Sequence, residues 1–78
     1  MSVNWREHIE CKPEVLCGKP VVRGTRLSVE LLLSLLAAGR EQAEILGSYP
    51  GLTREDLLAC LEYAHELVKT ERIVPISV

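Results

Sequence analysis

The chain is poor in aromatic residues, so aliphatic side chains must build its core. Its 78 residues contain no Phe, and the aromatic residues are Trp5, Tyr49 and Tyr63. Hydrophobic residues still make up 47% of the chain. A chain of this length forms one domain and buries only about 60–65% of the surface of its unfolded form. We therefore expect a single, marginally stable domain over residues 1–78, with a folded core over about 8–70.

The chain also lacks an excess of positive charge. Nine Lys and Arg residues stand against eleven Asp and Glu residues, which gives a formal net charge of -2 at pH 7. Strong nonspecific nucleic-acid binding usually comes with a basic surface, so the composition disfavours it. The N-terminus has no apolar segment typical of a secretory signal, and no apolar run approaches the ~20 residues of a membrane helix. These features predict a cytoplasmic protein with no membrane partner.

The chain has three cysteines, and they form no recognisable motif. Cys11, Cys17 and Cys60 are an odd number of thiols, and their spacing matches no zinc pattern. His8 and His65 have no nucleophile beside them, and no base, orienting group and pocket are indicated together. We predict no catalytic residue, no metal site and no small-molecule cofactor, and thus a protein that is not an enzyme.

The segment that organises the chain is GKPVVRGTR at residues 18–26. Its proline restricts residues 21–22 to a short or edge strand, and Gly24 is expected to take a positive φ in a tight turn. Ser28 follows as a helix N-cap. The alternation of polar and apolar residues over 8–11 predicts a second strand. We expect the two strands to pair.

Two of the three predicted helices follow this segment. The first spans about 29–38 and is apolar on more than one side, which indicates burial on more than one side. In a domain this small, the second side suggests a homodimer contact. Gly39 is its expected C′ residue. The second helix spans about 41–46, and Gly47 is expected to end it. The candidate dimer interface consists of Leu31, Leu35, Val21 and Val22.

The third predicted helix begins after Thr53, a capping residue with Asp56 at the capping-box position, and ends near residue 70. Its expected core stripe is Leu57, Leu61, Ala64 and Val68. The β-branched segment 71–78 predicts an extended tail that adds to a partner's sheet edge or fills a groove. The alternative is pairing with strand 21–22 of this chain or of a second copy. The candidate partner-binding residues of the tail are Arg72, Ile73, Val74, Ile76 and Val78.

With these segments placed, the sequence resembles the small bacterial family called domain of unknown function 433, over about residues 8–75. Two departures from the family pattern are Cys17, where a glycine is common, and the segment 40–42, which replaces a serine-type helix start. The blocks that carry the resemblance are Gly18 to Arg26, Ala37-Ala38-Gly39, Glu44-Ile45-Leu46, Tyr49-Pro50 with Leu52-Thr53, Glu55-Asp56-Leu57, and Tyr63-Ala64.

The resemblance implies a fold, a function and a partner. The fold is mainly α: a small three-helix, homeodomain-like and winged-helix-related domain of helix-turn-helix type, with a short N-terminal β element. Members of that family resemble VapB-type antitoxins, which implies a type II toxin–antitoxin pair with a PIN-like ribonuclease as the toxin partner. In such a pair the toxin carries the chemistry.

In a helix-turn-helix arrangement, the third helix would enter the major groove of DNA. Its solvent face carries Glu55, Glu62 and Glu66, and these charges repel phosphates. Base contacts would then come from its first turn. The cations of the central segment are better candidates, although Arg23 or Arg26 equally suits a structural role with a carboxylate or helix carbonyl. The candidate nucleic-acid-binding residues are Lys19, Arg23, Arg26, Thr53 and Arg54.

Two functions follow from these expectations. The first is an antitoxin-like binding protein that sequesters a basic ribonuclease through its acidic surface and tail, with binding to its own promoter DNA as an additional activity. The alternative is a DNA-binding transcriptional regulator, or a plain dimerisation and interaction module, without a toxin partner.

Overall fold

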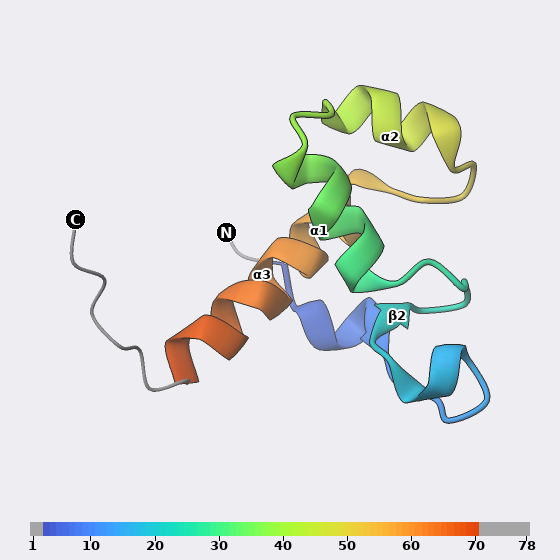
Figure 1. The fold of residues 1–78 in the computed structure, drawn as a ribbon, viewed down its shortest axis with the longest axis vertical. Helices are drawn as coiled ribbons and strands as arrows, with labels where there is room; N and C mark the ends of the chain where they lie inside the picture. Colours follow the sequence, from blue (N-terminus) through green and yellow to red (C-terminus); the bar gives the residue numbers. More distant parts are fainter. Residues whose placement is uncertain (1–2, 71–78) are drawn as a thin grey trace.

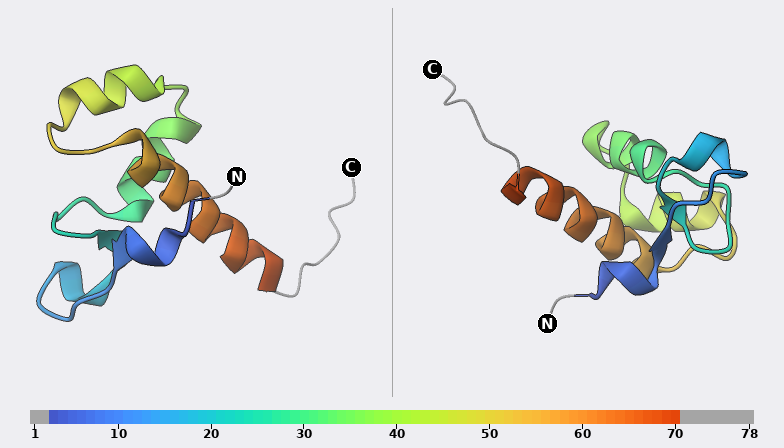
Figure 2. Two further views of the ribbon diagram at one scale, coloured as in Figure 1. Left: turned by 180° about the vertical axis from the view of Figure 1, so that it is seen from behind. Right: turned by 90° about the horizontal axis from the view of Figure 1, so that it is seen from below.

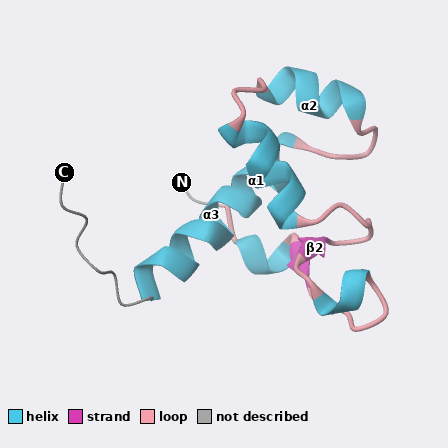
Figure 3. Ribbon diagram, in the orientation of Figure 1, coloured by secondary structure: helices cyan, strands magenta, loops and turns pink. Residues whose placement is uncertain are grey.

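Three helices and a two-stranded antiparallel sheet make up residues 3–70, the part of the chain that the computed structural model describes (Figure 1). The predicted mainly helical domain with a short N-terminal β element is confirmed (Figure 3). The candidate tail residues Arg72, Ile73, Val74, Ile76 and Val78 lie outside the described residues. In chain order, with η for a 3-10 helix, the elements are η1 (Trp5–Glu7), β1 (Ile9–Glu10), η2 (Leu16–Gly18), β2 (Val21–Val22), α1 (Val29–Ala37), α2 (Gln42–Ser48) and α3 (Arg54–Thr70).

The two strands pair as predicted, with Ile9 opposite Val22 and Glu10 opposite Val21. Gly24 takes φ +78° in the turn that follows. The side chains of Val21 and Val22 are 0% and 2% exposed. Their assignment to a dimer interface is therefore wrong, because both side chains fill the core of their own chain and leave no surface for a second copy.

Helix α1 begins and ends at the residues that the sequence indicates. The Ser28 hydroxyl accepts a hydrogen bond from the backbone N–H of Leu31 at 3.0 Å. Gly39 takes φ +90° after the helix. The N–H of Gly39 then donates to the carbonyl of Leu36 at 3.0 Å, and that of Arg40 donates to Leu35 at 3.1 Å. This pair of bonds is a Schellman motif, which satisfies carbonyls that the helix leaves open.

Helix α2 is longer than predicted, since it continues through Gly47 to Ser48. Gly47 has no positive φ, so it stays helical and does not terminate the helix. The helix ends at Tyr49, with φ -125° and ψ 85°, because the residue before Pro50 is disfavoured in helical geometry. The N-cap residue Glu41 makes no side-chain capping bond, in keeping with the absence of a serine-type start.

Helix α3 begins with the predicted capping box. The Thr53 hydroxyl accepts from the N–H of Asp56 at 3.1 Å, and a carboxylate oxygen of Asp56 accepts from the N–H of Thr53 at 3.0 Å. These reciprocal bonds satisfy two donors at the start of the helix. The first two turns of α3 then enter the core with Leu57, Ala59 and Cys60, each 0% exposed.

The second half of α3 extends beyond the other elements, as Figures 1 and 2 show. Leu61 is 42% exposed and Val68 is 57% exposed. The predicted core stripe is therefore correct at Leu57 and wrong at Leu61 and Val68. Leu61 faces away from the packed side of α3, since Cys60 and Tyr63 on either side of it are covered, and Val68 lies in the part of the helix that projects. None of the helices within residues 3–70 has both the length and the apolarity needed to cross a bilayer.

The core lies where α1, α3 and the hairpin meet, with α2 closing one side (Figure 1). The N-terminal segment also packs on α3, since the Trp5 and Tyr63 rings meet edge to face with centroids 4.9 Å apart. The buried core residues are Ile9, Val22, Val29, Leu32, Ile45, Leu52, Leu57, Ala59 and Cys60.

Candidate protein-binding surface

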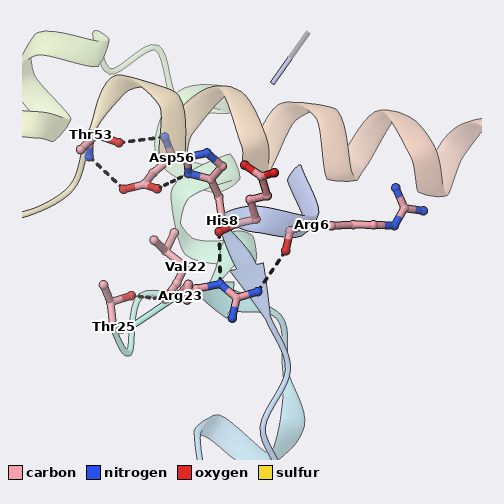
Figure 4. Close-up of polar contacts among 8 residues, drawn as sticks. Arg6, His8, Val22, Arg23, Thr25, Thr53 and Asp56 are labelled. Atoms are coloured by element: carbon pink, nitrogen blue, oxygen red, sulfur yellow. Dashed lines mark hydrogen bonds and ion pairs between the residues drawn. The ribbon is translucent and has the colours of Figure 1, made fainter. Parts of the chain in front are cut away.

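Arg23, a candidate for phosphate binding, is engaged by its own chain. Its Nε donates to the carbonyl of Glu7 at 3.1 Å and its Nη2 to the carbonyl of Arg6 at 3.0 Å (Figure 4). Its Nη1 lies 3.4 Å from a carboxylate oxygen of Glu10, and the other oxygen of Glu10 accepts from the N–H of Gly24 at 3.1 Å. The guanidinium therefore holds the turn after β2 against the N-terminal segment, which favours the structural alternative for this residue.

The other candidate cations are divided between paired and free. Lys19 lies 3.3 Å from a carboxylate oxygen of Glu30, and both side chains are exposed. Arg26 and Arg54 are exposed and make no side-chain hydrogen bond or ion pair within residues 3–70. Thr53 caps α3 through its hydroxyl. Of the five candidates, only Arg26 and Arg54 present a guanidinium without a partner in the described part of the chain.

His8 and Asp56 join segments that lie far apart in the sequence. Nδ1 of His8 lies 2.8 Å from one carboxylate oxygen of Asp56, whose other oxygen caps α3 at Thr53 (Figure 4). The side chains are 26% and 13% exposed. Sequence reasoning missed this contact, because the residues are separated by 48 positions. It anchors β1 to the start of α3.

The solvent face of α3 carries a line of carboxylates. Glu55, Glu62 and Glu66 are spaced by seven and four residues, which places them along one face of a helix. Glu55 is exposed, and Glu62 and Glu66 are each 32% exposed. Lys69 lies 3.9 Å from Glu66 at the end of this face. We call Glu55, Glu62 and Glu66 the acidic stripe.

His65 lies beside the acidic stripe on the exposed surface of α3. Its side chain is 64% exposed, with Nδ1 3.7 Å from Glu62 and 4.0 Å from Glu66. The ligand atoms of the three residues lie within 4.8 Å of one another, a spacing compatible with a cation. Exposed ion pairs on one helix account for the same geometry, so we assign no ligand to this cluster.

An apolar groove lies between α1 and α3. Its volume is about 400 Å³. The carboxylate–ammonium pair of Glu30 and Lys19 stands at its rim, and the rest of the lining is largely aliphatic. The lining residues are Lys19, Pro20, Ser28, Val29, Glu30, Leu33, Tyr63, Ala64 and Leu67.

Five large hydrophobic residues are exposed within the described range, and three of them, Leu61, Leu67 and Val68, lie on α3. Of the predicted dimer residues, Leu31 is 36% exposed, while Leu35 is half-buried beside a small polar pocket next to α2. The exposed apolar surface is thus concentrated on α3 and the groove. In the sequence, this exposed surface is indicated by the apolar spacing of α3, which continues beyond the last core residue of the helix.

The single buried thiol, that of Cys60, is expected to be unreactive. Burial, with a smaller contribution from the negative charge of Asp56, raises the pKa of Cys60 to about 12. A thiol with such a pKa carries almost no thiolate near neutral pH. Cys11 and Cys17 are exposed.

Comparison with known proteins identifies the family to which these features belong. The family model for proteins of unknown function named DUF433 matches residues 9–64. The chain belongs to the DUF433 family. A crystal structure of a DUF433 member from Anabaena variabilis ATCC 29413 is 36% identical, with a TM-score of 0.73, and the match covers 78% of this chain and 60% of that one.

A curated relative shares the same region. The uncharacterized protein y4eO of Sinorhizobium fredii (strain NBRC 101917 / NGR234) is 37% identical over 59 residues. This match covers 76% of the present chain and 27% of the relative. The chain thus spans about a quarter of the length of y4eO.

Proposed function

We propose that this DUF433 protein is the antitoxin of a type II toxin–antitoxin pair, similar to VapB-type antitoxins, and that it binds a PIN-like ribonuclease in the cytoplasm. The observation that carries the proposal is the acidic stripe on α3. A ribonuclease must attract an anionic substrate, so its active-site face is positively charged. A line of carboxylates on a rigid helix complements such a face and excludes RNA from it.

The charge pattern favours a protein partner over nucleic acid for α3 itself. Carboxylates that face phosphates reduce affinity, whereas complementary charges across a protein interface speed association and select the partner. The segment 71–78, with its apolar residues, supplies a second contact in this proposal. The inhibition itself requires no catalytic group from this chain.

The test is co-expression with the product of the adjacent gene, one chain tagged, followed by size exclusion at moderate and high salt. We expect the two proteins to co-elute, and the neighbour alone to arrest growth. The double variant Glu55→Lys/Glu62→Lys should weaken the complex about tenfold or more. The matched control is Glu14→Lys/Glu41→Lys, which changes the charge equally at exposed positions outside α3. Elution of this chain without its neighbour would contradict the proposal.

A second function, promoter or other DNA binding, rests on the two free guanidinium groups. In the homeodomain-like arrangement that we propose for α2 and α3, Arg54 stands at the start of the recognition helix and Arg26 precedes α1. Phosphate contacts make binding fall steeply with salt. We therefore expect Arg26→Gln or Arg54→Gln to lower the affinity for DNA and to make that affinity less dependent on salt concentration. DNA binding without any neighbour complex would favour a transcriptional regulator over an antitoxin.

A further inference from the structure

The exposed half of α3 has the pattern of a helix that pairs with another helix. Leu57, Leu61, Ala64 and Val68 are spaced by four, three and four residues, the alternation of a and d positions in a heptad. We call these four residues the seam. Leu57 is 0% exposed and packs in the core of its own chain. Leu61 and Val68 continue the same seam at 42% and 57% exposure. The core of the same chain thus covers the start of the seam and leaves Leu61 and Val68 exposed.

The charges of α3 are confined to the side away from this seam. Glu62, Glu66 and Lys69 fall at the b and f positions of the same heptad, which point outward in a helix pair. The positions beside the seam carry His65 and Leu67. A second helix can therefore cover the seam without burying a carboxylate or an ammonium group, a burial that costs several kcal/mol per ion when unpaired.

The surface beside the seam is concave where the seam is narrowest. Ala64 and Leu67 line the groove of about 400 Å³, and Leu33 of α1 lines it from the other side. A small residue between larger ones forms a hole that receives a side chain from a facing helix. Ala64 thus belongs both to the seam and to the lining of the groove.

We propose that two copies of this chain pair antiparallel through the exposed halves of α3. With the two-fold axis midway between Ala64 and Val68, Val68 of each copy lies over Ala64 of the other, so both holes are filled by the same contact. We infer the antiparallel direction from the fold, because the body of the domain lies at the N-terminal end of α3 and the C-terminal half projects from it (Figure 2). Overlap of the projecting halves keeps the two bodies apart, at opposite ends of the pair.

A second copy fits this surface better than a basic partner does. The seam is neutral and self-complementary, as an isologous two-fold contact requires, whereas a basic partner is matched by the acidic stripe on the opposite face. The pairing leaves that stripe accessible, so the inference does not depend on the antitoxin proposal. It also moves the dimer contact from the predicted residues of α1 and β2 to α3.

The dimer should be weak and concentration-dependent. About this axis the overlap runs from Glu62 to the end of α3 at Thr70, which is nine residues, or about 14 Å of helix. Such a contact falls at the small end of specific interfaces, so we expect a dissociation constant in the micromolar range. Sedimentation equilibrium over about 5–500 µM covers this range.

The decisive comparison is between Val68→Glu and Lys69→Glu. Both introduce one carboxylate into the same turn, but only position 68 lies in the seam. We expect Val68→Glu to weaken self-association at least about tenfold, because it buries a charge, and Lys69→Glu to behave as wild type. Circular dichroism and slow reaction of Cys60 confirm that each variant is folded. A wild-type chain that stays monomeric, or equal effects of the two variants, would overturn the proposal.

Cross-linking tests the direction of pairing. Ala64→Cys and Val68→Cys are made separately in a Cys11→Ser/Cys17→Ser background and then mixed under oxidising conditions. Antiparallel pairing predicts a disulfide-linked dimer that contains one chain of each kind. Cross-linked dimers formed by each variant alone, without the mixed product, would indicate parallel pairing and contradict the proposed geometry.

Discussion

His8 and Asp56 are joined by a hydrogen bond of 2.8 Å between Nδ1 and a carboxylate oxygen. With Asp56 ionised, the imidazole N–H is the donor. The same carboxylate caps α3 through the N–H of Thr53. One side chain thus fixes both the start of α3 and the position of the N-terminal segment against it.

Removal of this carboxylate should cost more than removal of the imidazole. We expect Asp56→Ala to lower the free energy of unfolding by about 2–3 kcal/mol, because it removes both a helix cap and a partly buried hydrogen bond. His8→Ala should cost about 1 kcal/mol. Urea denaturation of the two single variants and the double variant gives the coupling energy, which should be about 1 kcal/mol. The exposed His65→Ala is the control and should change stability by less than about 0.5 kcal/mol. Additive effects of the two substitutions would show that the contact contributes nothing.

Arg23 and Arg26 should differ in stability although they carry the same charge three residues apart. Arg23 donates to two backbone carbonyls of the N-terminal segment, whereas Arg26 has no such partner among the described residues. We expect Arg23→Gln to lower the free energy of unfolding by about 1 kcal/mol, and Arg26→Gln to leave it unchanged. Thermal denaturation of the pair measures the difference. Equal melting temperatures would show that Arg23 has no structural role, and Arg23 would then again be a candidate for phosphate binding.

The three thiols should separate into two reactive groups and one protected group. Cys11 and Cys17 are exposed, and Cys60 is buried with its pKa raised from 9.0 to about 12. In native protein at pH 8, a thiol reagent should modify two residues rapidly and the third only at the rate of unfolding. Rapid modification of all three would show that the first half of α3 opens easily.

The raised pKa of Cys60 also predicts a loss of stability in alkaline solution. Its contribution is fully present below pH 9, where both states keep the proton. As the pH rises from 9 to about 12, the unfolded thiol ionises while the folded one stays protonated. The free energy of unfolding should then fall by up to about 1.4 kcal/mol per pH unit. Cys60→Ala should show a shallower decline over this range, and identical slopes for the two proteins would contradict the assignment.

The turn before β2 contains strain that a glycine would relieve. Cys17 has φ 57° and ψ 34°, and Leu16 before it has φ 48°. A residue with a side chain costs about 1–2 kcal/mol in the left-handed region. Replacement by glycine removes this cost, but part of the gain is lost because glycine makes the unfolded chain more flexible. We expect Cys17→Gly to raise stability by about 0.5–1 kcal/mol, and Cys17→Ala, which keeps the Cβ atom, to leave it unchanged. Guanidinium denaturation checks both. A loss of stability in the glycine variant would show that the turn is unstrained.

Several features of this fold could be predicted because they depend on nearby residues. Ser28, Gly39 and the pair of Thr53 and Asp56 satisfy helix ends through bonds that span three to five residues, so local sequence is sufficient. The end of α2 was misplaced for a local reason as well. Gly47 tolerates helical geometry, and the restriction imposed by Pro50 on Tyr49 is stronger.

The candidate surfaces depended on information that no short segment contains. The spacing of Leu57, Leu61, Ala64 and Val68 is the same whether the covering surface is the chain's own core or another molecule. The structure decides between these by which side of α3 faces the other elements and by how far the helix projects beyond them. Arg23 is a similar case, because its sequence suits phosphate and carbonyl oxygens equally, and only the return of the N-terminal segment past β2 supplies the carbonyls.

By itself, then, the sequence determined the helices, the caps of α1 and the N-cap of α3, the hairpin and the family resemblance, since all of these follow from patterns along the chain. The tertiary structure alone decided which apolar residues are covered and which cations are occupied. It buried Val21 and Val22, left Leu61 and Val68 at the surface, and brought His8 to Asp56. The physical reason is that burial and pairing are properties of what lies opposite a residue in space, and here the opposite residue is usually distant in the sequence.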